Sequence, residues 1–254
     1  MTAAVRVAAV GDVHAGADTE SADRLRRGFA RLADRADLLL LAGDLTRCGD
    51  PAEVAVVAEA VAGTGVPAAA VLGNHDLHAG REAEVSSTLL DAGVAVLEGG
   101  ACEVGAAGAR VGVAGVKGFG GGFAGACVSE FGEPETKAFA RHAAEAAARL
   151  RQAMADIDGA DVRIALTHYS PVRDTLRGEP PELYPFLGSY LLAEAIDGAG
   201  ADLAVHGHAH HGTERGTTPG GIRVRNVAQP VIGSAYRLYE LHPRASRPEA
   251  SAAP

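Results

Sequence analysis

Short apolar runs alternate with amphipathic stretches along most of the chain, and this alternation is typical of an α/β protein. In the first third of the chain the pattern predicts three buried strands, over residues 5–10, 37–42 and 67–72. Each run ends at a glycine that is followed at once by Asp or by Asn and His. Because open α/β sheets bind ligands beyond the carboxyl ends of their strands, these polar residues are candidates for a site.

The rest of the pattern predicts further helices, further strands and one glycine-rich loop. Helices are expected from Ser21 or Asp23 to residue 36, and over residues 51–62, 134–157 and 188–196. Strands are expected over residues 94–97, 101–104, 110–116, 163–167, 202–205, 222–227 and 234–241. Residues 118–125 are so rich in glycine that we expect a flexible loop, which could act as a lid.

The length of 254 residues and the ordinary globular composition, 47% apolar and 22% charged, exclude a largely disordered chain. We expect residues 1–242 to form a single domain and residues 243–254, rich in Ala, Ser and Pro, to form a flexible C-terminal tail. The first residues lack the pattern of a signal peptide, and no apolar run reaches 18 residues. A cytoplasmic protein without a membrane segment is therefore expected.

Charge and cysteine content narrow the classes of partner. With 23 basic and 32 acidic residues the formal net charge is -9, so no broad basic surface is available and stable binding to duplex nucleic acid is not expected. Cys48, Cys102 and Cys127 are odd in number and far apart, which predicts free thiols. Nothing in the pattern indicates an oligomeric state.

Polar residues with oxygen and nitrogen donors gather just after the predicted strands. They are Asp12, His14, Asp44, Asn74, His168, His208 and His210. Taken singly, each is more often a turn residue or a hydrogen-bonded core histidine. Together they suit two first-row metal ions that share one carboxylate, since the set contains no thiolate. Alternation along an extended chain would place the two residues of each Asp-x-His or His-x-His pair on one side.

The same residues resemble, in order, the five motifs of the calcineurin-like metallophosphoesterase superfamily. The motifs read Asp12-x-His14, Gly43-Asp44, Gly73-Asn74-His75-Asp76, His168 and Gly207-His208-x-His210. The resemblance covers most of the chain. It implies an α/β fold, a four-layer αββα sandwich of two mixed β-sheets flanked by helices, with a dinuclear metal site at the C-terminal ends of the strands.

The resemblance also implies a role for each residue. Asp12, His14 and His210 would bind one metal, Asn74, His168 and His208 the other, and Asp44 would bridge both. The cofactors would be two divalent or mixed-valence ions, Mn, Fe or Zn, and a bridging hydroxide would attack phosphorus. His75 would be catalytic as a donor to a phosphate oxygen, and Asp76 could orient it.

The motifs also bear on the substrate. Residues 43–49 and Asp76 depart from the Gly-Asp-x-Val-Asp-Arg-Gly and Gly-Asn-His-Glu motifs of the protein phosphatases. The run Gly-Asp-Leu-Thr-x-x-Gly-x-Pro-x-Glu at residues 43–53 is similar to that of the small bacterial class III cyclic-nucleotide phosphodiesterases. We therefore expect hydrolysis of a small phosphodiester. The alternatives are a phosphomonoesterase, a nuclease or, less consistent with a full ligand set, a non-catalytic protein-binding scaffold.

The substrate-binding residues are not evident from the sequence. Lys117, Arg47, Tyr169 and Tyr184 follow strands or lie in loops where they could contact substrate, although such side chains are more often solvated. The net charge of -9 does not exclude an anionic phosphoester, because two bound dications would make the cleft locally positive.

Overall fold

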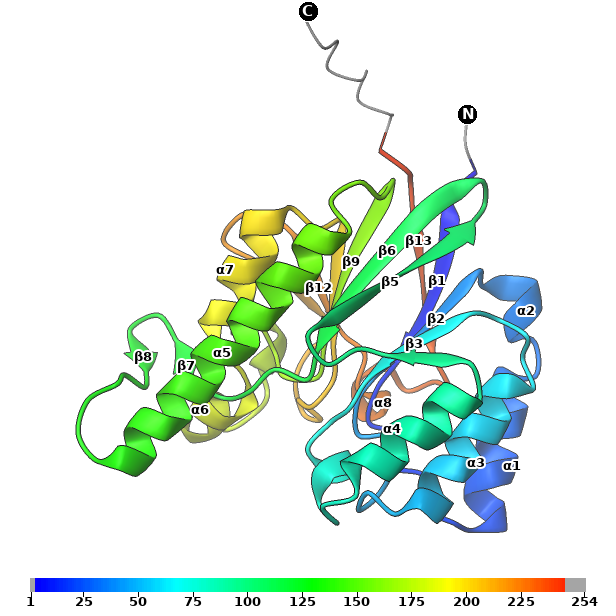
Figure 1. Cartoon of the computed structure of the whole chain (residues 1–254), viewed down its shortest axis with the longest axis horizontal. Coiled ribbons are helices and arrows are strands. Elements are labelled where there is room, and N and C mark those ends of the chain that lie inside the picture. The colour runs from blue at the N-terminus through cyan, green and yellow to red at the C-terminus, as the bar shows by residue number, and fades with distance from the viewer. Residues whose placement is uncertain (1–2, 245–254) are drawn as a thin grey trace, which may run out of the picture.

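The computed structural model describes residues 3–244. Two mixed β-sheets pack face to face, and helices cover both outer faces, so the predicted αββα sandwich is confirmed (Figure 1). Two short strands, β7 (Gly122–Phe123) and β8 (Ala126–Cys127), form a separate hairpin.

The first sheet has five strands in the order β13-β1-β2-β3-β4. They are β1 (Val5–Val10), β2 (Leu38–Ala42), β3 (Ala68–Val71), β4 (Val94–Val96) and β13 (Arg237–Leu241). Strands β1 to β4 are parallel, and β13 pairs antiparallel with β1 at the edge. Every residue of β2 is buried, as expected for an apolar parallel strand that is covered on both faces. The outer face of this sheet is covered by four helices (Figure 1). They are α1 (Thr19–Phe29), α2 (Leu32–Arg35), α3 (Pro51–Ala62) and α4 (Glu82–Asp91).

The second sheet has six strands in the order β11-β12-β10-β9-β6-β5. They are β5 (Gly100–Ala106), β6 (Ala109–Val116), β9 (Val162–Thr167), β10 (Leu203–His206), β11 (Arg215–Thr217) and β12 (Arg223–Asn226). The four central strands are parallel, and β5 and β11 are antiparallel edges. Helices α5 (Pro134–Asp156) and α7 (Tyr190–Ala199) pack on its outer face (Figure 1).

Shorter elements complete the chain. They are the helical turns α6 (Tyr184–Leu187) and α8 (Gln229–Ile232) and the 3-10 turns η1 (His75–Leu77), η2 (Asp174–Leu176) and η3 (Pro181–Leu183). No helix within residues 3–244 has both the length and the apolar character needed to cross a membrane. The three cysteines are free, as predicted.

The main core joins the two sheets and continues under helices α1 to α4. It includes Leu39 and Leu41 from β2 and Ile164 and Leu166 from β9. A second core fills the space between the six-stranded sheet and α5 and α7. Because both sheets contribute to the main core, their parallel strands are held in a fixed relation to one another.

Several predicted boundaries are wrong in detail. The helix expected up to residue 36 is divided into α1 and α2, with a turn at residues 30 and 31. The helix expected from residue 188 begins at Tyr190, because the Ser189 side chain caps it by accepting from Leu191 N. Helix α4 was not predicted, since only Val85 and Leu89 of its residues are buried and the apolar stripe is weak.

The glycine-rich segment is not the flexible loop that the sequence predicts. Gly121 N donates to Pro185 O at 2.7 Å, Gly122 N donates to Gly188 O at 2.9 Å, and most of residues 118–123 are buried. A Cβ atom at Gly120 would contact Pro185 O and would lie 3.1 Å from Phe186 Cα. The glycines here permit close approach of two backbone segments.

Residues 243 and 244 of the expected C-terminal tail lie within the described part of the chain, and Arg244 contacts the domain. Arg244 N donates to Asp161 O at 2.9 Å, and the Arg244 guanidinium contacts the carboxylate of Asp202 at 2.8 Å. Residues 245–254, the remainder of that prediction, lie outside the described residues.

Candidate metal centre

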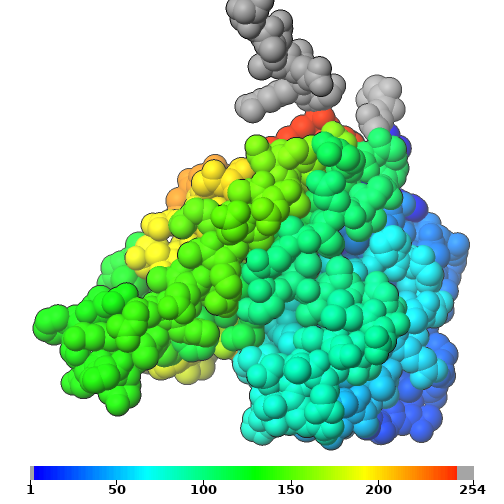
Figure 2. Space-filling view, in the orientation of Figure 1, coloured from blue at the N-terminus to red at the C-terminus, as the bar shows by residue number. Residues whose placement is uncertain are grey.

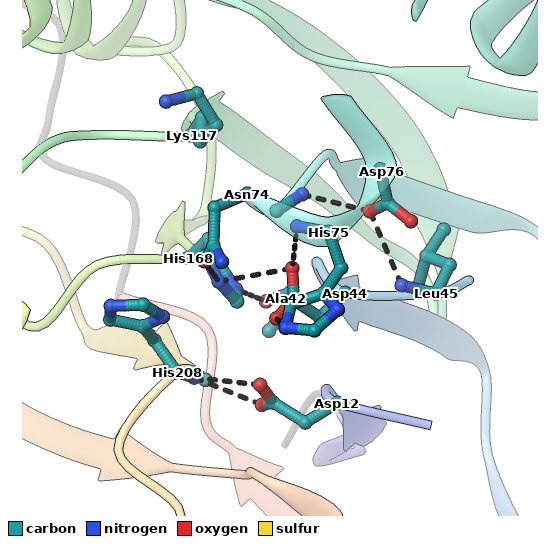
Figure 3. A network of polar contacts seen from close by, with 12 residues as sticks. Asp12, Ala42, Asp44, Leu45, Asn74, His75, Asp76, Lys117, His168 and His208 are labelled. Carbon is teal, nitrogen blue, oxygen red and sulfur yellow. Dashed lines mark hydrogen bonds and ion pairs between the residues drawn. The ribbon is translucent and has the colours of Figure 1, made fainter. Parts of the chain in front are cut away.

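The predicted ligands follow the ends of five parallel strands, three from one sheet and two from the other. Figure 3 shows Asp12, Asp44, Asn74, His168 and His208 close together. Asp12 and His14 follow β1, Asp44 follows β2, Asn74 follows β3, His168 follows β9, and His208 and His210 follow β10. The structure brings all seven together although they span nearly 200 positions of the chain.

The side chains form two groups that share Asp44. The first contains Asp12, His14, Asp44 and His210, and the second contains Asp44, His168 and His208. Within each group the donor atoms lie within 4.8 Å of one another. Asn74 joins the second group, since its Oδ1 lies 3.0 Å from His168 Nε2. These are the two sets that the resemblance implies, with Asp44 between them.

The backbone at these ligands adopts an unusual conformation. Asp12, His14, Asp44 and His208 have φ values of 55, 42, 50 and 70°. Among the described non-glycine residues only Ala107 shares a positive φ. Such residues cost of order 1–3 kcal/mol each and persist only where the surrounding structure determines them. The two packed sheets therefore hold the ligands in strained positions.

Two glycines give the carboxylates room. A Cβ atom at Gly73 would collide with the Asp44 carboxylate and backbone nitrogen, and one at Gly207 would collide with the Asp12 carboxylate. His208 N donates to both Asp12 oxygens, at 2.9 and 3.1 Å. Glycine in these motifs thus permits close contact between the ligand-bearing loops.

The rings of two candidate ligands are oriented by backbone carbonyls. His168 Nδ1 donates to Ala42 O at 2.8 Å, which directs Nε2 toward Asp44 Oδ1 at 3.4 Å. His208 Nε2 donates to Phe186 O at 3.3 Å, which leaves Nδ1 free. Hydrogen bonds of this kind determine the tautomer and orientation of metal-ligating histidines.

Burial sets the protonation of the cluster. It lowers the pKa of His168 and of His208 to about 3, so both rings are neutral at neutral pH, the form that binds metals. Burial raises the pKa of Asp12 to about 6, although a hydrogen bond from His210 opposes the rise. A nearby cation would reverse this rise by favouring the carboxylate.

An unpartnered nitrogen within the donor set gives independent support for a metal centre. His14 Nε2 is buried and has no hydrogen-bond partner among residues 3–244, and it lies 3.9 Å from Asp44 Oδ2. A buried, unpartnered nitrogen is costly unless another species binds it. With its nitrogen and oxygen donors and no thiolate, the cluster suits two first-row ions.

His75 lies beside the cluster rather than within either group. Its backbone N donates to Asp44 Oδ1 at 2.8 Å, and its Nδ1 donates to Arg47 O at 2.7 Å. The ring Nε2 lies 3.9 Å from Asp44 Oδ2, and the ring is partly exposed. The side chain is thus aimed at the space next to the shared carboxylate (Figure 3).

Asp76 does not orient His75, so that prediction is wrong. Its fully buried carboxylate accepts from Thr46 N at 2.8 Å, Thr46 Oγ1 at 2.6 Å, Gly73 N at 2.8 Å and Leu45 N at 3.2 Å. In Figure 3 its hydrogen bonds run to Leu45 and to the turn before Asn74, and none reaches the His75 ring. Asp76 instead ties the loop after Asp44 to the turn before Asn74, and the Arg47 carbonyl orients His75.

The structure adds two polar residues that support the His208–His210 loop. Asn226 Nδ2 donates to Ala209 O at 2.8 Å, and buried His206 Nδ1 donates to Gly207 O at 2.7 Å. The position of His206 next to the motif hinted at such a role, but nothing in the sequence marked Asn226, which comes from the neighbouring strand β12.

The candidate substrate residues differ in their surroundings. Tyr169 is 7% exposed and packs on the His208 ring with centroids 4.3 Å apart. Arg47 is exposed, and its guanidinium pairs with Asp18 at 3.1 Å. Lys117 O accepts from His168 N, so Lys117 adjoins the ligand loop after β9 (Figure 3).

Comparison with known families gives the class of this protein. Residues 5–212 match the model of the calcineurin-like phosphoesterases, so the chain belongs to that family. The family is dependent on a dinuclear metal centre, and it hydrolyses phosphoesters. No curated protein matches the chain.

Solved structures share the fold at low sequence identity. Phosphopantetheinyl hydrolase of Mycobacterium tuberculosis superposes with a TM-score of 0.66 at 15% identity, covering 100% of both chains. The protein TT1561 of Thermus thermophilus gives 0.57 at 18% identity, covering 93% of this chain and 98% of that one. GAP50, an anchor in the inner membrane complex of Plasmodium, gives 0.55 at 15% identity, covering 90% and 72%. At these identities the similarity shows the fold alone.

Replacement of Asp76 tests its structural role. Asp76→Ala should lower the free energy of unfolding by about 3 kcal/mol or more, because several buried N–H groups lose their acceptor at about 1–3 kcal/mol each. Denaturant unfolding measures this change. Asp91→Ala, at an exposed acidic residue of α4, should change it by less than about 0.5 kcal/mol. Equal stabilities of the two variants would contradict the role.

Replacement of Gly73 tests the close approach of the ligand loops. Gly73→Ala should weaken Mn²⁺ binding by about 10- to 100-fold, because the new methyl group displaces Asp44. Isothermal titration calorimetry measures the affinity. The control is Gly198→Ala in α7, where a Cβ atom meets nothing within 4 Å. This control should keep the affinity and stabilise the helix by up to about 1 kcal/mol. Unaltered binding in Gly73→Ala would refute the argument.

Proposed function

We propose that this protein is a metal-dependent phosphodiesterase that hydrolyses a small phosphodiester, a cyclic nucleotide or a related compound. The observation that carries the proposal is the convergence of two donor groups on the shared carboxylate of Asp44. Asp12, His14, Asp44 and His210 would hold one ion, and Asp44, Asn74, His168 and His208 the other. Mn, Fe and Zn all suit this nitrogen and oxygen set.

When bound, the two ions supply Lewis acidity and an activated water. Hydrolysis joins a water oxygen to phosphorus, breaks one ester P–O bond and delivers a proton to the departing alcohol. His75 is the residue positioned to donate that proton, because its Nδ1–H is held by Arg47 O and its Nε2 faces the side of Asp44. Such donation requires a protonated Nε2 at the start of the step.

The loop that follows β2 favours a diester over a monoester. Residues 43–53 are similar to the corresponding run of the small bacterial class III cyclic-nucleotide phosphodiesterases. In this run Thr46 bonds to Asp76 and Glu53 accepts from Cys48 N, so these two residues shape the loop.

A paired substrate assay tests the proposed reaction. With Mn²⁺, Zn²⁺ or Fe²⁺ supplied in turn, kcat/KM for bis-p-nitrophenyl phosphate should exceed that for p-nitrophenyl phosphate by at least about tenfold. Release of p-nitrophenolate measures both rates. A preference for the monoester would replace the diester by a phosphomonoesterase activity, and no hydrolysis with any metal would favour a binding scaffold.

Two variants separate metal binding from proton donation. Asp44→Ala should abolish hydrolysis and the bound metal together, because it removes the carboxylate common to both groups. His75→Ala should keep the metal content and lower kcat by about 10²–10⁴-fold. Elemental analysis and turnover are measured on the same samples, with Asp91→Ala as a matched control. Full activity in Asp44→Ala would eliminate the two-metal account.

A further inference from the structure

Aromatic residues are concentrated in one part of the chain. The chain has only six Phe and five Tyr, and residues 119–190 contain five of these Phe and three of these Tyr. This part includes β7, β8, α6 and the start of α5, which project beyond the sandwich (Figures 1 and 2). Most aromatic residues of this aromatic-poor chain thus lie in one segment, which also carries the ligand candidate His168.

Four of these rings form a continuous row that begins at a metal-ligand candidate. Tyr169 lies 4.3 Å from the His208 ring, Phe119 lies 5.8 Å from Tyr169, Phe139 lies 4.8 Å from Phe119, and Phe186 lies 6.2 Å from Phe139, between centroids. We name Tyr169, Phe119, Phe139 and Phe186 the aromatic wall. Adjacent rings at these separations make favourable contacts.

Exposure increases along the aromatic wall from the metal centre outward. Tyr169 is 7% exposed, Phe119 and Phe139 are half-buried, and Phe186 is 59% exposed. Core packing accounts for the inner ring but leaves the outer ring uncovered. An exposed large apolar side chain at the mouth of a site is a feature of ligand-binding surfaces.

The outer end of the aromatic wall is also tied to the metal centre through the backbone. Phe186 O accepts from His208 Nε2 at 3.3 Å, so the residue with the exposed ring orients a candidate ligand. Gly120 lets the wall pack closely, since a Cβ atom there would lie 3.1 Å from Phe186 Cα and 3.2 Å from Phe139 Cζ. The backbone of Phe186 is therefore held next to the cluster, and its ring contacts Phe139.

A cation lies on the inner part of the aromatic wall. Lys117 Nζ is 5.2 Å from the Tyr169 ring centroid and 5.4 Å from that of Phe119. Within residues 3–244 no carboxylate lies within 4 Å of this ammonium, and Glu98, which accepts from Lys117 N, pairs with Arg149. Positive charge next to an apolar surface suits a ligand that is anionic at one end and apolar at the other.

We propose that the aromatic wall binds an apolar ester group of the phosphodiester substrate while the phosphoryl group lies at the metal centre. This inference rests on the proposed function and specifies its substrate class. The three outer rings of the wall are phenylalanines, which have no hydrogen-bonding groups, so this part selects by apolar contact area rather than by a polar pattern. An alkyl chain and an aromatic ring share this chemistry.

A homologous set of esters tests the wall. The substrates are methyl, octyl and phenyl p-nitrophenyl phosphate, which share one leaving group, and the octyl ester is kept below its micelle-forming concentration. In the Mn²⁺-loaded protein, kcat/KM for the octyl or the phenyl ester should exceed that for the methyl ester by about tenfold, through a lower KM. A gain with octyl identifies an alkyl group, and a gain with phenyl alone identifies a ring.

Variants show whether the aromatic wall causes the gain. The measured quantity is the ratio of kcat/KM for the octyl or phenyl ester to that for the methyl ester. Phe186→Ala should reduce this ratio to about twofold, and Phe186→Leu, which remains apolar, should keep most of it. Phe139→Ala is a second variant of the aromatic wall, and it should also lower this ratio while the contact between Phe186 O and His208 stays in place. The matched control is Leu90→Ala, at a side chain of α4 that is 57% exposed, and it should leave the ratio unchanged.

The outcomes distinguish the two proposals. Equal kcat/KM for all three esters, or a ratio that survives Phe186→Ala and Phe139→Ala, overturns the aromatic wall as a binding site and leaves the phosphodiesterase intact. Absence of hydrolysis for every ester and metal overturns the proposed function and this inference with it.

Discussion

The shared position of Asp44 between two donor groups is the constraint on which the rest of the structure depends. A single carboxylate can serve both groups only if strands from two different sheets end at the same place. The core between the sheets holds β2 and β9 together, and so places Asp44 near His168. Packing, rather than any local contact, thus creates the site.

Strain and support are combined at this point. Four candidate ligands have positive φ values, and the strained backbone at Asp44 persists only because the surrounding structure holds it. Asp76 contributes to this support. Its carboxylate accepts from Thr46 N in the loop that carries Asp44 and from Gly73 N in the neighbouring turn. The glycines at 73 and 207 then allow the loops to approach. Buried, neutral histidines and a strained ligand backbone lower the free energy of unfolding, and bound cations can raise it again.

The resemblance of five short motifs to the calcineurin-like superfamily implied the sandwich, and the sequence pattern itself placed polar donors just after the parallel strands. The structure has the sandwich and brings these donors close together. Sequence reasoning misjudged Asp76, since adjacency to His75 says nothing about where a side chain points. It took residues 118–125 for a flexible loop, because glycine content does not distinguish freedom from close packing. The aromatic wall joins Phe119, Tyr169 and Phe186 through tertiary contacts, which no local pattern encodes.

The most direct measurement of the central claim is electron paramagnetic resonance of the chain titrated with Mn²⁺. If Asp44 bridges two ions, binding should saturate at two Mn²⁺ per chain, and the spectrum should show exchange coupling between the ions. One bound ion per chain, or two ions with the spectra of isolated Mn²⁺, would contradict the account.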